Sequence, residues 1–127
     1  MGEENCTLTR IYYFSAAHRL HNDKFSDKKN KKIFGKCNNP KGHGHDYYVE
    51  LSVKGAISPD TGMIINIEDL DGVAFKIIDK LDHKRLDVEI EYFTKVNASG
   101  ENIAKYLWKR FIDEIPSPAF LFHIRLW

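Results

Sequence analysis

The chain has 127 residues, of which 43% are apolar and 29% are charged. This length fits one domain that can bury a sizeable core without disulfides, and the composition argues against a disordered or membrane-spanning protein. Nineteen lysines and arginines against eighteen aspartates and glutamates give a net charge of +1, which favours neither nucleic acid nor anionic lipid as a partner. The two cysteines form no disulfide framework, and residues 1–10 lack the apolar core of a secretory signal, so we expect a cytoplasmic protein.

The first half of the chain predicts two long strands with a polar segment between them. Residues 7–17 are rich in β-branched and aromatic side chains, which favours a strand. Residues 21–36 are polar and contain six lysines, and Ser26 is placed to cap a short helix there. Residues 45–57 alternate between apolar and polar side chains, which predicts a half-buried strand.

The second half predicts one short strand, two helices and a final strand. Residues 63–67 are apolar and follow a turn, so we expect a strand there. Apolar residues then recur at helical spacing over 68–80, which predicts an amphipathic helix. A second helix is expected to begin near Gly100 with Ser99 as its N-cap, and residues 119–127 form a final apolar strand. The resulting order β-β-β-α-α-β predicts an α+β domain with an antiparallel sheet.

The chain ends on this apolar strand, at Trp127, with no polar residues after it. Such a strand normally has a neighbour on each side or a cap on its edge. We therefore expect residues 1–127 to be a single domain that lacks its last C-terminal strand.

A histidine pair stands at the start of the second long strand. His43 and His45 are two residues apart, so in an extended backbone both rings point to the same side. His18, at the end of the first strand, is a candidate for a third imidazole. Three histidines leave an open fourth position on zinc, as in catalytic sites. Taken singly, the His-Gly-His motif is weak, and His18 is typical of an ordinary strand residue.

Cys37 lies in a loop of turn-forming residues beside Lys36. A positive neighbour and a nearby metal lower the pKa of a thiol and make the thiolate available, which suits catalysis. The alternative is that Cys37 is a fourth ligand that closes a purely structural zinc site. The sequence leaves both interpretations open.

Two acidic residues are further candidates. Asp82 precedes His83, and a carboxylate beside an imidazole orients it for proton transfer, although such a pair is also typical of a surface ion pair. Glu101 lies at the expected start of the second helix, where it suits either binding of an amine-rich ring or a contact with the helix dipole.

Five blocks occur in order along the chain: FSAAHRL, FGKCNNPKGHGHDYYV, TGMIIN, LDHKRLD and GEN. Together they resemble the 6-pyruvoyl-tetrahydropterin synthase family from Phe14 onward. The resemblance implies a zinc ion held by three histidines: His18, His43 and His45. It also implies that Cys37 is the general base, that Asp82 and His83 relay a proton, and that Glu101 lies in the pterin pocket.

The resemblance implies a tunnelling fold (T-fold), with two helices on one face of an antiparallel sheet. Its subunits assemble into a β-barrel, two trimers forming a homohexamer. The implied reaction, in tetrahydrobiopterin biosynthesis, converts 7,8-dihydroneopterin triphosphate to 6-pyruvoyl-tetrahydropterin and releases triphosphate.

Two alternatives remain. The related 6-carboxytetrahydropterin synthases usually carry a shorter spacing between the cysteine and the His-Gly-His motif, so the five residues between Cys37 and His43 favour the pyruvoyl enzyme. Family members also continue past the strand that matches 119–127 with a glutamate that anchors the pterin ring. We therefore expect either a fragment or splice variant of an active enzyme, or a natural short form that binds zinc but is weakly active or inactive.

Overall fold

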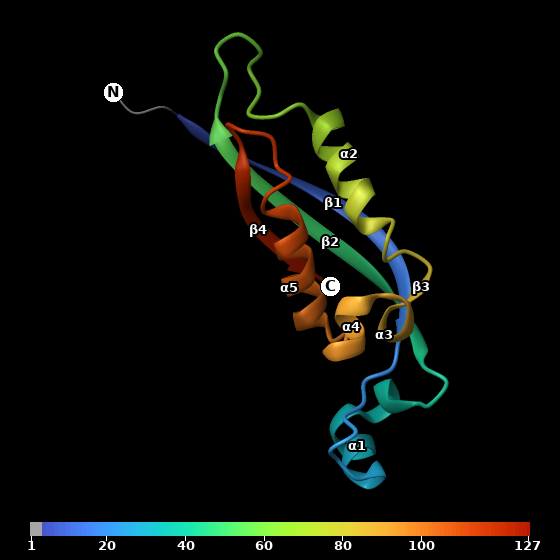
Figure 1. The fold of residues 1–127 in the computed structure, drawn as a ribbon. Coiled ribbons are helices and arrows are strands. Elements are labelled where there is room, and N and C mark those ends of the chain that lie inside the picture. The colour runs from blue at the N-terminus through green and yellow to red at the C-terminus, as the bar shows by residue number, and fades with distance from the viewer. Residues whose placement is uncertain (1–3) are drawn as a thin grey trace.

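A four-stranded sheet forms the framework of the computed structural model, which describes residues 4–127 (Figure 1). β1 (Asn5–His18) and β2 (His43–Ala56) are long and pair antiparallel over their whole length. β4 (Phe120–Leu126) pairs antiparallel with the other edge of β2, and the two-residue β3 (Lys84–Arg85) pairs with β1, which gives the order β3-β1-β2-β4. The three strands predicted over 7–17, 45–57 and 119–127 are thus confirmed.

Two main helices cover one face of this sheet, as predicted (Figure 1). They are α2 (Ile67–Ile78) and α5 (Gly100–Phe111). The hydroxyl of Ser99 accepts a hydrogen bond from the backbone N–H of Asn102 at 3.2 Å, so Ser99 is the N-cap that the sequence indicated. An α+β domain with helices on one side of a sheet is the result.

Four short helical segments complete the fold: α1 (Asp27–Phe34), the 3-10 helix η1 (Gly35–Asn38), α3 (Leu86–Glu89) and α4 (Glu91–Lys95). Ser26 caps α1 by accepting from the N–H of Lys29 at 3.2 Å, as predicted. In Figure 1, α1 and η1 extend beyond the end of the sheet at which β1 finishes and β2 begins. The loop with Cys37 therefore lies at the same end of the sheet as His18 and His43.

The predicted strand over 63–67 is wrong. Residues 63–66 form no strand but bend at Ile64 and Ile65, which are both buried, and Ile67 begins α2. A short apolar run indicates that its side chains are buried, but it does not distinguish a strand from a buried loop between other elements. The third strand is instead β3, which pairs parallel with β1. The sheet is therefore not wholly antiparallel, and the predicted order of elements is corrected accordingly.

The core lies between the sheet and the two main helices. From β2, alternate residues Val49, Leu51 and Val53 are fully buried, which confirms the predicted two-residue period. The ring of Phe14 on β1 stacks on Tyr47 with centroids 4.9 Å apart. This packed layer makes β1 and β2 a rigid support for the histidines at their ends.

Within residues 4–127, no helix has the length and apolar character needed to cross a membrane. Residues 1–3, part of the segment searched above for a secretory signal, lie outside the described residues.

Candidate metal centre and active site

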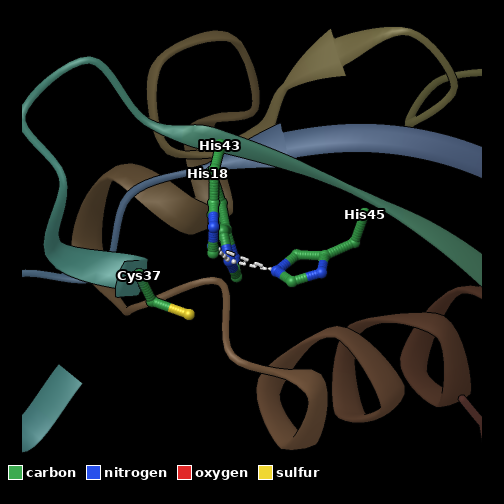
Figure 2. Close-up of side chains that lie close together, drawn as sticks. All are labelled: His18, Cys37, His43 and His45. Atoms are coloured by element: carbon green, nitrogen blue, oxygen red, sulfur yellow. Dashed lines mark hydrogen bonds between the residues drawn. The ribbon is translucent and has the colours of Figure 1, made fainter. Parts of the chain in front are cut away.

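Three histidines meet at one end of the sheet. The register of β1 and β2 places His18 opposite His43 and Ala16 opposite His45. Because side chains alternate along a strand, the three rings lie on the helix-covered face. Their Nε2 atoms form a nearly equilateral triangle, with separations of 3.0 Å for His18–His43, 3.1 Å for His18–His45 and 3.0 Å for His43–His45 (Figure 2). The structure thus brings together the three predicted ligands.

The backbone sets the proton position on His18. Its Nδ1 atom lies 2.7 Å from the carbonyl oxygen of Ala98, in the loop before α5. A carbonyl only accepts, so Nδ1 carries the hydrogen, and the neutral ring presents a lone pair at Nε2. Metal-binding histidines characteristically donate their other N–H to such a partner.

The three Nε2 atoms cannot satisfy one another with hydrogen bonds. Each nitrogen of a neutral ring either donates or accepts, so among three mutual neighbours at least two are in the same state. At least one of the three contacts is then donor against donor or lone pair against lone pair. A cation at the centre removes this conflict, because all three rings then present lone pairs to it.

The dimensions fit a divalent transition metal. Two nitrogens bound tetrahedrally to zinc at about 2.0–2.1 Å lie about 3.3 Å apart, within a few tenths of an ångström of the separations here. The sulfur of Cys37 belongs to the same group, since the four potential ligand atoms all lie within 4.8 Å of one another. Imidazole and thiolate donors suit zinc and other borderline metals better than calcium or magnesium.

Burial and neighbouring charge favour the neutral form of two of these imidazoles, His18 and His43. Burial lowers the pKa of His18, although the bond to Ala98 opposes this, and the charges of His45 and His43 lower it further. Burial and the charge of His45 likewise lower the pKa of His43. A metal binds neutral imidazole, so these directions favour metal binding at neutral pH.

Cys37 is held beside the triangle by the segment that follows His18. The N–H of Leu20 donates to the Cys37 carbonyl at 2.7 Å, and Asn38 Nδ2 donates to the Leu20 carbonyl at 2.8 Å. Arg19 Nε donates to the Asn38 carbonyl at 3.0 Å. Three hydrogen bonds therefore fasten η1 to the end of β1 and fix the position of the thiol.

The half-buried sulfur of Cys37 points toward the imidazole nitrogens but stands apart from them (Figure 2). The buried ring of Tyr47 lies beside His45, with ring centroids 5.7 Å apart, and burial, with a smaller effect from the charge of Cys37, raises the pKa of that phenol to about 12. Tyr47 is therefore a neutral wall of the site. This placement suits both a base next to an open metal position and a fourth ligand, the two interpretations that the sequence left open.

Asp82 and His83 are paired at the β3 edge of the sheet. Asp82 Oδ2 accepts from His83 Nδ1 at 2.9 Å, and Oδ1 accepts from the backbone N–H of Ser15 at 2.9 Å. The Ser15 bond and then the His83 contact lower the pKa of Asp82. His83 adopts the left-handed conformation (φ 59°) and donates its own N–H to the Ser15 carbonyl at 2.6 Å, which leaves its ring largely exposed.

An open groove of about 540 Å³ connects this pair with the histidine cluster, since both His83 and His45 line it. Glu101 is placed differently. It lies exposed in the first turn of α5, two residues after the cap Ser99. No hydrogen bond joins Glu101 to the cluster among the described residues, and its helix approaches the site through the bond from His18 to Ala98.

The sequence pointed to the side chains of the cluster but missed its backbone and supporting partners. The role of the Ala98 carbonyl cannot be inferred from a sequence, because every residue carries the same backbone carbonyl whatever its side chain. Asn38, at the end of η1, is a polar residue that nothing in its immediate sequence distinguishes from a solvated one.

The sequence of this chain is similar to those of known proteins that form one family. Residues 7–127 match the model of the family described as 6-pyruvoyl tetrahydropterin synthase. The chain belongs to the 6-pyruvoyl tetrahydropterin synthase family. It is 47% identical over 111 residues to the 6-pyruvoyl tetrahydrobiopterin synthase of Poecilia reticulata, covering 87% of this chain and 76% of that protein. It is 46% identical over 110 residues to the human enzyme of the same name, covering 86% and 76%.

A solved member of the 6-pyruvoyl tetrahydropterin synthase family has the same architecture. The Caenorhabditis elegans 6-pyruvoyl tetrahydropterin synthase superposes with a TM-score of 0.87 at 33% identity, covering all of this chain and 98% of that one. The expected T-fold is thus confirmed for the subunit.

Proposed function

We propose that this chain is a zinc-dependent lyase that converts 7,8-dihydroneopterin triphosphate to 6-pyruvoyl-tetrahydropterin and releases triphosphate. The observation that carries this proposal is the triangle of imidazole nitrogens at 3.0–3.1 Å with a cysteine sulfur beside it. Membership of the 6-pyruvoyl tetrahydropterin synthase family supplies the reaction and the pterin substrate.

In this proposal His18, His43 and His45 hold the zinc ion. When bound, zinc acts as a Lewis acid on the side chain of the substrate and makes the adjacent carbon-bound hydrogens more acidic. The packed sheet and the His18–Ala98 bond orient the imidazoles before the metal arrives.

Cys37 is the proposed general base. Its sulfur lies within 4.8 Å of the imidazole nitrogens, and as a thiolate it accepts a proton from a substrate carbon. The carbon–oxygen bond to triphosphate breaks, a proton leaves a neighbouring carbon, and further protons move between side chain and ring. The electrons therefore balance within the substrate, and no external oxidant is required.

Asp82 and His83 are proposed to move a second proton. The aspartate carboxylate stabilises the protonated imidazole of its neighbour, and the Ser15 N–H holds that carboxylate in place. Glu101 is proposed to accept hydrogen bonds from the amino edge of the pterin, a charge-assisted contact of about 1.5–3 kcal/mol. We further propose a homohexamer of two barrel-forming trimers in the cytoplasm.

The decisive experiment measures triphosphate release from 7,8-dihydroneopterin triphosphate by the zinc-loaded chain, with the pterin product identified in parallel. Cys37→Ala is compared with Cys6→Ala, which removes an exposed thiol at the other end of β1, about 40 Å away along the strand. We expect release that is lost in Cys37→Ala and retained in Cys6→Ala, with zinc bound in both.

Other outcomes separate the alternatives. A 6-carboxytetrahydropterin product would replace the proposed reaction with that of the related enzymes. Loss of zinc in Cys37→Ala would make Cys37 a ligand of a closed site and remove it as the base. Zinc binding without any release by the unmodified chain would favour the weakly active homologue.

A further inference from the structure

The turn that precedes the His-Gly-His motif has few contacts of its own. The N–H of Gly42 donates to the Asn39 carbonyl at 2.8 Å, and Asn39 Nδ2 donates back to the Gly42 carbonyl at 3.2 Å. These bonds close the turn, and the N–H of Asn39 joins its first residue to η1 by donating to the Lys36 carbonyl at 3.2 Å. His43 follows immediately, so any tilt of the turn moves a predicted metal ligand.

Arg85, on the opposite side of β1, reaches across to this turn. Its Nη1 donates to the Lys41 carbonyl at 3.2 Å. Its guanidinium also lies directly over Gly42, where an added Cβ would be 2.9 Å from Arg85 Cζ. Gly42 has a φ of 76°, so glycine is favoured there by both backbone conformation and space.

Arg85 is itself fixed in place. Its Nε and Nη2 donate to the two carboxylate oxygens of Asp87 at 2.8 and 3.0 Å, a two-point contact that only arginine makes. The backbone N–H of Arg85 donates to Glu89 Oε2 at 2.6 Å. All three guanidinium nitrogens thus donate hydrogen bonds within the chain, which holds the side chain in one orientation between Asp87 and the turn.

We propose that Arg85 is a positioning residue that holds the Lys41–Gly42 turn and thereby sets the place of His43 in the metal cluster. Because Arg85 stands two residues after His83 on the same segment, it also ties the loop of the metal ligands to the segment of the Asp82–His83 pair. The inference rests on the proposed function in one respect, the assignment of the three histidines as metal ligands.

The test compares Arg85→Met and Arg85→Lys with Arg110→Met, which removes an exposed arginine near the end of α5. Zinc affinity is measured by competition with a chromophoric chelator. Hydrogen exchange of the amides of residues 39–43 is measured on the metal-free chain. We expect Arg85→Met to weaken zinc binding about tenfold, at the lower end of the effect of partners that orient ligands. Exchange at Gly42 should accelerate, and Arg110→Met should leave both measurements unchanged.

The conservative variant separates positioning from general stability. Arg85→Lys keeps the charge but loses the two-point contact, so its zinc affinity should lie between those of the unmodified chain and Arg85→Met. Asp87→Asn should also weaken zinc binding, because it loses the carboxylate that holds the Arg85 guanidinium in place. Its effect should therefore add less than fully to that of Arg85→Met in the double variant. A purely structural role would lower the unfolding temperature without changing zinc affinity.

Two results would overturn the inference: zinc affinity and exchange of residues 39–43 that are unaltered in Arg85→Met, or fully additive effects of the Arg85 and Asp87 substitutions. If Arg85→Met does not fold, Gly42→Ala perturbs the same contact from the turn side and should show the same losses. If the unmodified chain binds no zinc, the proposed function fails, while the exchange measurement still decides whether Arg85 holds the turn.

Discussion

Metal binding should stabilise this chain, and removal of His45 should abolish that stabilisation. His45 is the exposed member of the cluster, whereas His18 is buried and bonded to Ala98. Substitution of His45 by alanine therefore removes one ligand at little cost to the metal-free fold. The remaining pair, His18 and His43, can then form one ordinary donor–acceptor contact, which relieves the conflict among the three nitrogens.

The magnitude follows from mass action. At a free zinc concentration one hundred times the Kd, binding to the folded chain alone adds about 2.7 kcal/mol to the free energy of unfolding. For a domain of this size, such a change raises the unfolding temperature by about 8–14 °C. A surface substitution such as His45→Ala should change the metal-free stability by about 0.5 kcal/mol or less.

The assay is thermal unfolding followed by circular dichroism, with and without zinc. His123→Ala is the control, because it removes an exposed histidine from β4, outside the cluster. We expect the zinc-dependent rise in the unmodified chain and in His123→Ala, and its absence in His45→Ala. A full rise in His45→Ala would show that the three histidines do not act as one site.

The lowered pKa values of His18 and His43 mean that the unfolded chain binds more protons below about pH 6.5, so the metal-free free energy of unfolding should fall as the pH drops through that value; a flat profile from pH 7.5 to 5.5 in denaturant titrations would contradict this. Ser99→Ala removes the acceptor of the Asn102 N–H and should cost about 1 kcal/mol in urea unfolding, and no loss would mean that the cap is dispensable. Leu51→Ala empties a fully buried position and should cost about 2–5 kcal/mol in the same assay, whereas a cost under 1 kcal/mol would indicate a loosely packed core.

The regular parts of this fold could be predicted from local pattern. Alternation over 45–57 and helical spacing over 68–80 are consequences of which side chains are buried, so they are legible in the sequence. The segment 63–67 failed for the same reason, because burial of Ile64 and Ile65 needs no strand. β3 was missed because two residues with charged side chains have no pattern to detect.

In the candidate site, too, local spacing could be predicted from the sequence, whereas contacts between distant segments could not. The two-residue spacing of His43 and His45 places both rings on one side of any strand, so the sequence alone determined how two of the three histidines lie relative to each other. The register between β1 and β2, which brings His18 opposite His43, depends on pairing of strands far apart in the chain. Only the tertiary structure decided that Ala98 sets the proton on His18 and that Arg85 spans β1 to the turn at Gly42. Such contacts join backbone and side chains across 40 to 80 residues, and no local pattern encodes them.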